Sequence, residues 1–261
     1  MTDDPQSERR PWRFFGLVFV LSLPLYLLSP FVHVSGLPKN GPILDFVGAF
    51  MPMVAAVILT GRAAGRRGVR ELLGRAVDFR RIPARRWYLV MILLMPAVYL
   101  LTAVALWVTD VRLPVQPSLS PLAMLVFVPV FVLAATGEEL GWTAYATDPL
   151  RSRYGPLAAS LIIALPWWAW HLYSIISSGQ TSTLVVLGFF ATIGFRIIYV
   201  WLYGATGSVA SVIILHAMTN VAASYLPMVP TSAAAPVLLV VAAVIAVSWT
   251  VARRRSRVLA S

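Results

Sequence analysis

Two adjacent glutamates, Glu138 and Glu139, follow an uncharged apolar run that extends from Leu122 to Ala135. A charged side chain in hydrocarbon costs about 2.5–3.5 kcal/mol on insertion scales, so acids at this depth are rare and usually functional. Such a pair needs a partner, a proton or a metal ion. Because adjacent helical residues are rotated by roughly 100°, at most one glutamate can face a shared centre squarely, and the other has a supporting role.

Two of the three histidines lie inside later apolar runs. His171 follows a tryptophan-rich stretch, and His216 precedes Asn220 by four residues, a spacing that places both on one helix face. A single buried histidine is more often a hydrogen-bonded structural residue than a ligand. Three apolar runs that carry an acid, a His and a His/Asn pair at bilayer depth weaken that interpretation and indicate a shared polar site.

Two hydrolytic chemistries fit these residue types. In the first, carboxylate and imidazole bind a catalytic zinc ion, which uses three protein ligands and keeps a position for water. In the second, no metal is needed: a glutamate is the general base for a water that His polarises, and His and Asn stabilise the oxyanion. Both hydrolyse an amide or ester, and the sequence leaves them open. The zincin pattern His-Glu-x-x-His and the rhomboid-like Gly-x-Ser-Gly pattern do not occur.

The elements that position these residues are apolar helices. The chain has 261 residues, of which 59% are hydrophobic and 12% charged, a composition typical of a polytopic membrane protein. We predict an all-α fold, a bundle of about eight transmembrane helices that forms a single integral-membrane domain over 1–261, with a catalytic core at about 119–226. The predicted spans are Phe14–Val34, Ile43–Gly61, Trp87–Thr109, Leu119–Tyr145, Pro156–Ile176, Thr183–Tyr203, Ser208–Leu226 and Ala233–Val251.

Positive charge predicts the orientation of the bundle, because Lys and Arg concentrate in cytoplasmic loops. If eight helices alternate, almost all of the 21 Lys and Arg residues fall on one side, and both termini are cytoplasmic. Nine are arginines of the segment 62–86, which we predict to be a basic cytoplasmic loop lying at anionic lipid headgroups. The net charge of +11 does not indicate nucleic-acid binding, since no zinc-finger, helix-turn-helix or RNP-like pattern accompanies it.

The first apolar stretch, Phe14–Val34, follows several arginines and lacks an Ala-x-Ala exit. We therefore expect an uncleaved signal-anchor helix rather than a cleaved signal peptide. Richness in Arg, Ala and Pro with almost no Lys is typical of a high-GC bacterial gene, so we expect a multi-pass protein of the bacterial inner (plasma) membrane. With no Cys, the chain has no thiolate nucleophile and no disulfide framework.

The ordered motifs resemble those of the CPBP intramembrane metalloproteases, the CAAX prenyl protease and bacteriocin-processing group also called the Abi family. Glu138-Glu139 resembles the start of the family's Glu-Glu-x-x-x-Arg motif. Trp167-x-x-x-His171 is similar to its Phe-x-x-x-His motif, and His216-x-x-x-Asn220 matches its His-x-x-x-Asn motif. The order, the spacing and the eight-helix count agree over nearly the whole chain.

The resemblance implies an intramembrane endopeptidase that hydrolyses a peptide bond of a hydrophobic peptide or membrane-protein substrate. It assigns the general base to Glu138, a supporting role to Glu139, a metal or water ligand to His171, and metal or oxyanion contacts to His216 and Asn220. All five are expected catalytic residues. The implied cofactor is a divalent metal, zinc by preference, with Glu138, His171, His216 and Asn220 as its ligands.

One position departs from the family pattern, because Thr143 stands where the first motif has Arg. Removing one half of a buried ion pair costs about 3–5 kcal/mol if the other half stays charged, so Glu139 must be protonated, bound to a metal ion or paired with another residue. Arg196, the one basic residue inside a predicted span, either replaces that Arg or extends to the membrane interface. The departure also supports an alternative function: a catalytically inactive member that binds a membrane partner, as in self-immunity. A small proton-coupled carrier is disfavoured, because the chain has no repeated halves.

Overall fold

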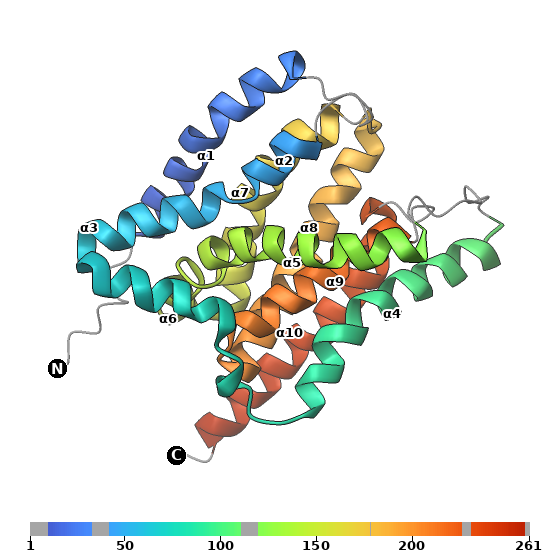
Figure 1. The fold of residues 1–261 in the computed structure, drawn as a ribbon. Helices are drawn as coiled ribbons and strands as arrows, with labels where there is room; N and C mark the ends of the chain where they lie inside the picture. Colours follow the sequence, from blue (N-terminus) through green and yellow to red (C-terminus); the bar gives the residue numbers. More distant parts are fainter. Residues whose placement is uncertain (1–9, 33–41, 111–119, 178, 226–230, 259–261) are drawn as a thin grey trace.

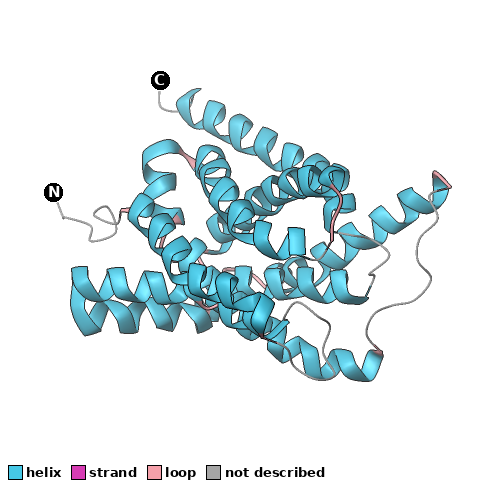
Figure 2. Cartoon of the chain, turned by 90° about the horizontal axis from the view of Figure 1, so that it is seen from above, coloured by secondary structure: helices cyan, strands magenta, loops and turns pink. Residues whose placement is uncertain are grey.

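The computed structural model describes residues 10–32, 42–110, 120–177, 179–225 and 231–258, and these residues are almost entirely helical (Figure 2). Six of the described helices are long and apolar enough to cross a membrane, and two shorter apolar helices follow them. The chain is therefore an all-α, multi-pass integral membrane protein, as its composition predicts. The helices are α1 (Pro11–Leu28), α2 (Pro42–Gly48), α3 (Met51–Gly74), α4 (Arg86–Val108), α5 (Pro121–Trp142), α6 (Thr147–Tyr154), α7 (Pro156–Ser177), α8 (Ser182–Thr206), α9 (Val209–Tyr225) and α10 (Ala235–Val258).

Each of the eight predicted spans overlaps one of the helices α1, α3, α4, α5, α7, α8, α9 and α10. The second predicted span, Ile43–Gly61, also overlaps α2, which ends at Gly48 before α3 begins. Three predicted ends, at Val34, Leu119 and Leu226, lie outside the described residues, and so do Lys39 and Arg112. Figure 1 places the segment that leads into α4 and the C-terminal end of α10 on the same lower side of the molecule. That placement agrees with the orientation that the positive charges predict.

The basic segment 62–86 differs from the predicted loop, because α3 continues as a helix to Gly74. At Gly65 the backbone adopts φ 60° and ψ −159°, which breaks the helical path inside α3. Glycine reaches a positive φ without the steric cost that a Cβ imposes, so this residue allows the basic half of α3 to turn away from its apolar half (Figure 1). The short 3-10 turns Arg75–Val77 and Phe79–Arg81 follow.

Close packing against the start of α3 fixes how α5 is rotated. A Cβ on Gly137 would lie 2.6 Å from the carbonyl oxygen of Ala49, and one on Gly141 would lie 2.6–2.7 Å from atoms of Pro52. Small residues four apart allow two membrane helices to approach this closely. Since the glycine face of α5 rests on α3, the glutamates between the two glycines lie on other faces of the helix.

Helix α9 lies inside the bundle and packs against α4, α5 and α8, while α8 also packs against α7 and α10 (Figure 1). On the α10 side, a Cβ on Gly194 would lie 2.7 Å from the Cβ of Leu238, so α8 and α10 are in near backbone contact. These contacts bring α5, α7, α8 and α9 around one volume, where the polar residues of the sequence analysis meet.

The segment after α3 is tied into this bundle by a carboxylate. Asp78 accepts hydrogen bonds from the Ser208 hydroxyl at 2.7 Å and from the backbone N–H groups of Val209 at 3.3 Å and Ala210 at 3.0 Å. These N–H groups belong to the first turn of α9, where a helix has no partners of its own. Asp78 therefore adds to the N-terminal cap of α9, where the Ser208 hydroxyl also accepts from the backbone N–H of Ser211 at 3.2 Å.

Arg75 anchors the same segment to α5 and α8. Its guanidinium donates to the carbonyl oxygen of Ala144 at 3.1 Å and to the hydroxyl of Tyr203, and it lies 3.6 Å from Asp148. Tyr203 in turn donates to Asp148 at 2.7 Å. Ala144 follows the end of α5, so this network holds the turn directly after the two glutamates.

Candidate active site

Three helices carry the candidate residues. Glu138 and Glu139 lie near the C-terminal end of α5, His171 lies on α7, and His216 and Asn220 lie on α9. Glu138, Glu139 and His216 are buried, with side chains 8%, 0% and 5% exposed, whereas the side chain of His171 is 35% exposed. His171 therefore marks the more open side of an otherwise enclosed polar site.

Glu138 faces both histidines. Its Oε2 lies 3.9 Å from Nε2 of His171, and its Oε1 lies 4.0 Å from Nε2 of His216. These distances are longer than a hydrogen bond and suit one small group, such as a water molecule, between the carboxylate and each ring. The indole N–H of Trp167 donates to Oε2 of Glu138 at 2.8 Å and fixes the position of the carboxylate.

The other ring nitrogen of each histidine is already engaged. Nδ1 of His171 lies 2.9 Å from the carbonyl oxygen of Trp167, and Nδ1 of His216 lies 2.9 Å from Oε1 of Glu139. Carbonyl and carboxylate oxygens only accept hydrogen bonds, so each Nδ1 carries the proton and donates it. In the neutral rings, both Nε2 atoms are then left with a lone pair on the side of Glu138.

Glu139 belongs to a separate ion pair. Arg196 on α8 donates from Nη1 to Oε2 at 3.1 Å and from Nη2 to Oε1 at 2.8 Å, and both side chains are buried inside the bundle, at 1% and 0% exposed. Thr143 also donates to Oε2. This confirms that Arg196 pairs with Glu139, and the interpretation that Arg196 extends to the membrane interface is wrong.

Asn220 is partly exposed, and its side chain makes no hydrogen bond within the described part of the chain. It lies one helical turn after His216, so the amide shares a face of α9 with that ring. Within the described part of the site, the Asn220 amide therefore has donors and an acceptor that no hydrogen bond uses.

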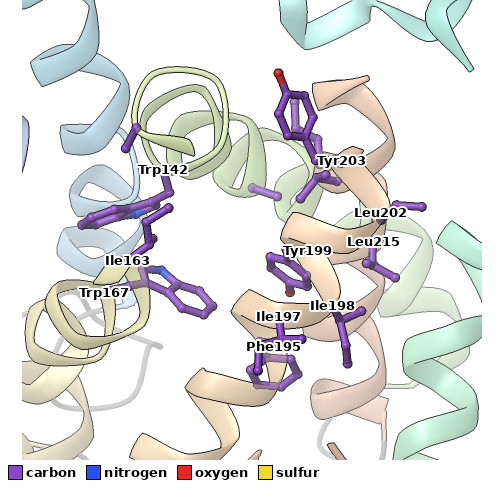
Figure 3. Packing of buried hydrophobic residues seen from close by; sticks show 14 of the residues in the cluster. Trp142, Ile163, Trp167, Phe195, Ile197, Ile198, Tyr199, Leu202, Tyr203 and Leu215 are labelled. Carbon is purple, nitrogen blue, oxygen red and sulfur yellow. The ribbon is translucent and has the colours of Figure 1, made fainter. Parts of the chain in front are cut away.

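Trp167 is a site residue that the sequence indicated only as the aromatic member of a motif. Besides its two hydrogen bonds, its ring lies beneath the Arg196 guanidinium, with 3.8 Å between Cζ and the ring centroid. Figure 3 shows Trp167 on α7 directed toward Tyr199 on α8, with 6.1 Å between the ring centroids. The available signal was chemical: a Trp in the place of a Phe adds an N–H donor to a buried site.

Helix α1 supports α7 from outside the site. Trp170 donates from its indole N–H to the Ser22 hydroxyl at 2.7 Å, and its carbonyl oxygen accepts from the Tyr26 hydroxyl at 2.6 Å. Trp170 directly precedes His171, so these two contacts with α1 restrain the backbone from which His171 extends.

The chemistry of the donors fits a divalent cation. Histidines that bind metal through Nε2 commonly donate Nδ1–H to a carbonyl or carboxylate, and His171 and His216 both have this arrangement. Among the residues that the structure describes, no group of three His, Asp and Glu side chains is arranged to hold a metal ion. The fit thus rests on the types of the donors and on which ring nitrogens carry protons, since the described residues do not form a complete set of three such ligands.

Comparison with known proteins identifies one family model and one curated relative. The family model "Type II CAAX prenyl endopeptidase Rce1-like" matches residues 120–222, which extend from the start of α5 into α9. The chain is also similar to CAAX prenyl protease 2 of Methanococcus maripaludis, with 29% identity over 172 residues. That match covers 62% of this chain and 61% of the relative's length, so the chain spans less than two thirds of this curated protein.

Proposed function

We propose that the chain is an intramembrane endopeptidase. It belongs to the CPBP family, as its match to the Rce1-like family model and its similarity to a CAAX prenyl protease indicate. Its substrate would be a hydrophobic or membrane-associated peptide, cleaved by a water that Glu138 activates. The single observation that carries this proposal is the position of Glu138, whose two oxygens face Nε2 of His171 and of His216 at 3.9 and 4.0 Å.

In the proposed reaction, a water lies between Glu138 and the two imidazoles. Glu138 takes a proton from this water while the water oxygen attacks the carbonyl carbon of the scissile peptide. Asn220, whose amide is not used elsewhere in the described structure, donates to the oxyanion that forms. Glu138 then gives its proton to the departing amine, which breaks the C–N bond. Trp167 keeps the carboxylate in place throughout.

We further propose that His171 and His216 bind a divalent cation, zinc by preference, with Glu138 and Asn220 as the remaining candidate ligands. Such a cation would polarise the peptide carbonyl and make the attacking water more acidic. Metal content of the purified protein tests the assignment. Zinc that is retained at full occupancy in both His171→Ala and His216→Ala would exclude these residues as ligands.

Thr143 supports the alternative of an inactive, binding-only member, because the motif position has no cation. Arg196 reduces that support, since it supplies a guanidinium to the same carboxylate from α8. Peptidase activity therefore remains the better-supported proposal. A wild-type protein that is folded but cleaves none of the peptides tested would favour the binding function instead.

A cleavage assay of the full chain in lipid nanodiscs tests the enzyme. Since the relative is named a CAAX prenyl protease, the first probe is an internally quenched peptide with a prenylated CAAX end, beside the same peptide without the prenyl group. We expect Glu138→Gln to lower the rate by at least about 100-fold. Glu71→Gln is the matched control, because Glu71 is a largely exposed carboxylate with a side chain 66% accessible. Equal rates for wild type, Glu138→Gln and His171→Ala would refute the proposal.

The exposed arginines of α3 lead to a proposal about partners. Arg62, Arg66, Arg67 and Arg70 all lie on the exposed surface of the helix beyond or near the Gly65 break. We propose that they contact anionic lipid headgroups, an attraction worth about 1 kcal/mol for each basic residue near the surface. The four side chains lie within three turns of helix, which concentrates their charge.

A further inference from the structure

The carboxylate of Glu139 has no acceptor position to spare. Its Oε1 accepts from Arg196 and from His216, and its Oε2 accepts from Arg196 and from Thr143. Two carboxylate oxygens provide about four lone-pair sites, and four donors fill them. Glu139 therefore has nothing left with which to take a proton from water or to bind a metal, and its contribution to a reaction must act through the groups that it holds.

His216 is the group in that set that reaches the proposed reaction centre. Glu139 accepts its Nδ1–H at 2.9 Å, while Nε2 of the same ring faces Glu138. The direction of the His216 ring and the location of its proton thus depend on where Oε1 of Glu139 lies. Arg196 sets the position of this carboxylate, because it donates to both oxygens in a bidentate pair and so fixes the carboxylate plane.

The Arg196 guanidinium also contacts the second support of the site. It stacks on the ring of Trp167, and the indole N–H of this residue holds Glu138. The Nε of Arg196 is buried and has no hydrogen-bond partner among the described residues, so the two Nη atoms carry all of its hydrogen bonds there. One side chain of α8 thereby connects the two glutamates, one through a salt bridge and one through an aromatic ring.

We propose that Arg196 is a positioning residue: it locks Glu139 so that His216 keeps its proton on Nδ1 and presents the Nε2 lone pair to Glu138. The expected effect of Arg196 on cleavage rests on the proposed function. The expected effect of Arg196 on the His216 proton does not depend on any substrate. Without Arg196 a buried carboxylate loses its countercharge and two of its four donors. The His216 proton is then no longer confined to Nδ1, and a proton on Nε2 blocks the lone pair that faces Glu138.

Thr143 provides a test in which the cation is moved rather than removed. Its hydroxyl donates to the same Glu139 oxygen that Arg196 Nη1 contacts, and it lies one turn from Glu139 on the same helix. In the double variant Arg196→Met with Thr143→Arg, the new guanidinium can occupy the space that the old one leaves. If the role of Arg196 is to place a positive charge against Glu139, the double variant should recover the Nδ1–H tautomer of His216 and the cleavage rate that Arg196→Met loses.

The experiment uses the full chain in nanodiscs with 15N-labelled histidine at one fixed pH. Nitrogen NMR shifts report which ring nitrogen of His216 carries the proton. We expect Nδ1–H in the wild type, a mixture of both tautomers in Arg196→Met, and Nδ1–H again in the double variant. Arg151→Met is the control, because Arg151 is a partly buried cation that pairs with Asp148 outside the site; its His216 signal should equal that of the wild type.

Cleavage of the prenylated peptide gives the second measurement. We expect Arg196→Met to lower kcat by about 10- to 100-fold with little change in KM, because substrate contacts are not altered, and the double variant to recover most of this loss. Arg196→Lys keeps the charge but not the bidentate grip, so it should retain the Nδ1–H signal with an intermediate kcat.

Several results would overturn the inference. One is an unchanged His216 signal in a folded Arg196→Met protein; another is a double variant that folds but shows the altered tautomer mixture. If Arg196→Met does not fold, the His216 nitrogen signals of the double variant and of Arg196→Lys test the inference instead. A double variant that fails to fold, while Arg196→Lys folds, counts against the inference. A wild type that cleaves no peptide refutes the proposed function, while the NMR result still tests the role of Arg196.

Discussion

Asp78 and Ser208 are 130 positions apart in the sequence, yet the Ser208 hydroxyl donates to the Asp78 carboxylate at 2.7 Å. Through this contact and two backbone N–H groups, the segment after the basic half of α3 caps the helix that carries His216. Hydrogen bonds to charged groups contribute about 1.5–3 kcal/mol each. We expect Asp78→Ala to destabilise the protein by at least about 2 kcal/mol, measured by steric trapping in micelles. Glu71→Ala, which breaks an exposed pair, should cost less than about 1 kcal/mol.

Gly141 allows α5 to rest on Pro52, and any side chain there must separate the two helices. Gly141→Ala places a Cβ within 2.7 Å of Pro52 backbone atoms, and overpacking of this kind costs about 1–3 kcal/mol. We expect a loss of stability of that size, accompanied by a fall in cleavage rate because Glu138 shifts with α5. The matched control is Gly16→Ala on α1, where nothing lies within 4 Å of the added atom. Similar effects at the two positions would contradict the packing argument.

Trp167→Phe keeps an aromatic ring under Arg196 but removes the N–H that donates to Glu138. We expect kcat for the peptide probe to fall by about 10- to 100-fold, with KM nearly unchanged. Trp168→Phe is the neighbouring control, since Trp168 donates to the carbonyl oxygen of Val185 and not to the site. Loss of activity in Trp168→Phe alone would show that Glu138 does not depend on the indole of Trp167.

Asn220 distinguishes a role in the reaction from a role in folding. Because its side chain makes no hydrogen bond within the described residues, Asn220→Ala should change the free energy of unfolding by less than about 0.5 kcal/mol. If the amide donates to the oxyanion, kcat should nevertheless fall by about 100- to 1,000-fold. A stable variant with wild-type kcat would exclude the oxyanion assignment.

The α3 arginines should make binding to lipid surfaces depend on charge. Replacing Arg62, Arg66 and Arg70 by Gln should weaken enrichment of anionic lipid around the reconstituted protein by about 1 kcal/mol for each charge removed. Native mass spectrometry of nanodiscs that contain phosphatidylglycerol and phosphatidylcholine measures this enrichment. Arg86→Gln, a single exposed charge at the start of α4, should have a smaller effect than the triple variant. Equal enrichment in all three proteins would refute the lipid contact.

Hydrophobicity was sufficient to predict a multi-pass all-α protein and the approximate places of its apolar helices, because a helix in lipid must be apolar over its length. It did not predict the break between α2 and α3 inside the second span. The pairing of Glu139 with Arg196 was also accessible, since a buried carboxylate needs a cation and only one lay inside a predicted span. The basic segment was not predictable in the same way. Arg75 and Asp78 resemble the other charges of a hydrophilic loop, and only the folded chain brings them to Ala144 and to the first turn of α9.

The bond from Trp167 to Glu138 was missed for a related reason. From the sequence, a tryptophan four residues before a histidine in an apolar run cannot be distinguished from a packing residue. Only the folded structure shows that its indole N–H donates to a carboxylate. Distances between Glu138 and the two rings likewise depend on how α5, α7 and α9 cross, which spacing along the chain does not determine.

The position of Arg196 has a consequence for how sequence patterns detect related enzymes. A pattern that demands an arginine four residues after the second glutamate would reject this chain, although a guanidinium meets that glutamate in space. In this chain the cation comes from α8 and makes the contact with Glu139 that an arginine at position 143 of the chain would make from the end of α5. A search for distant members of the family gains by allowing either helix to supply the cation.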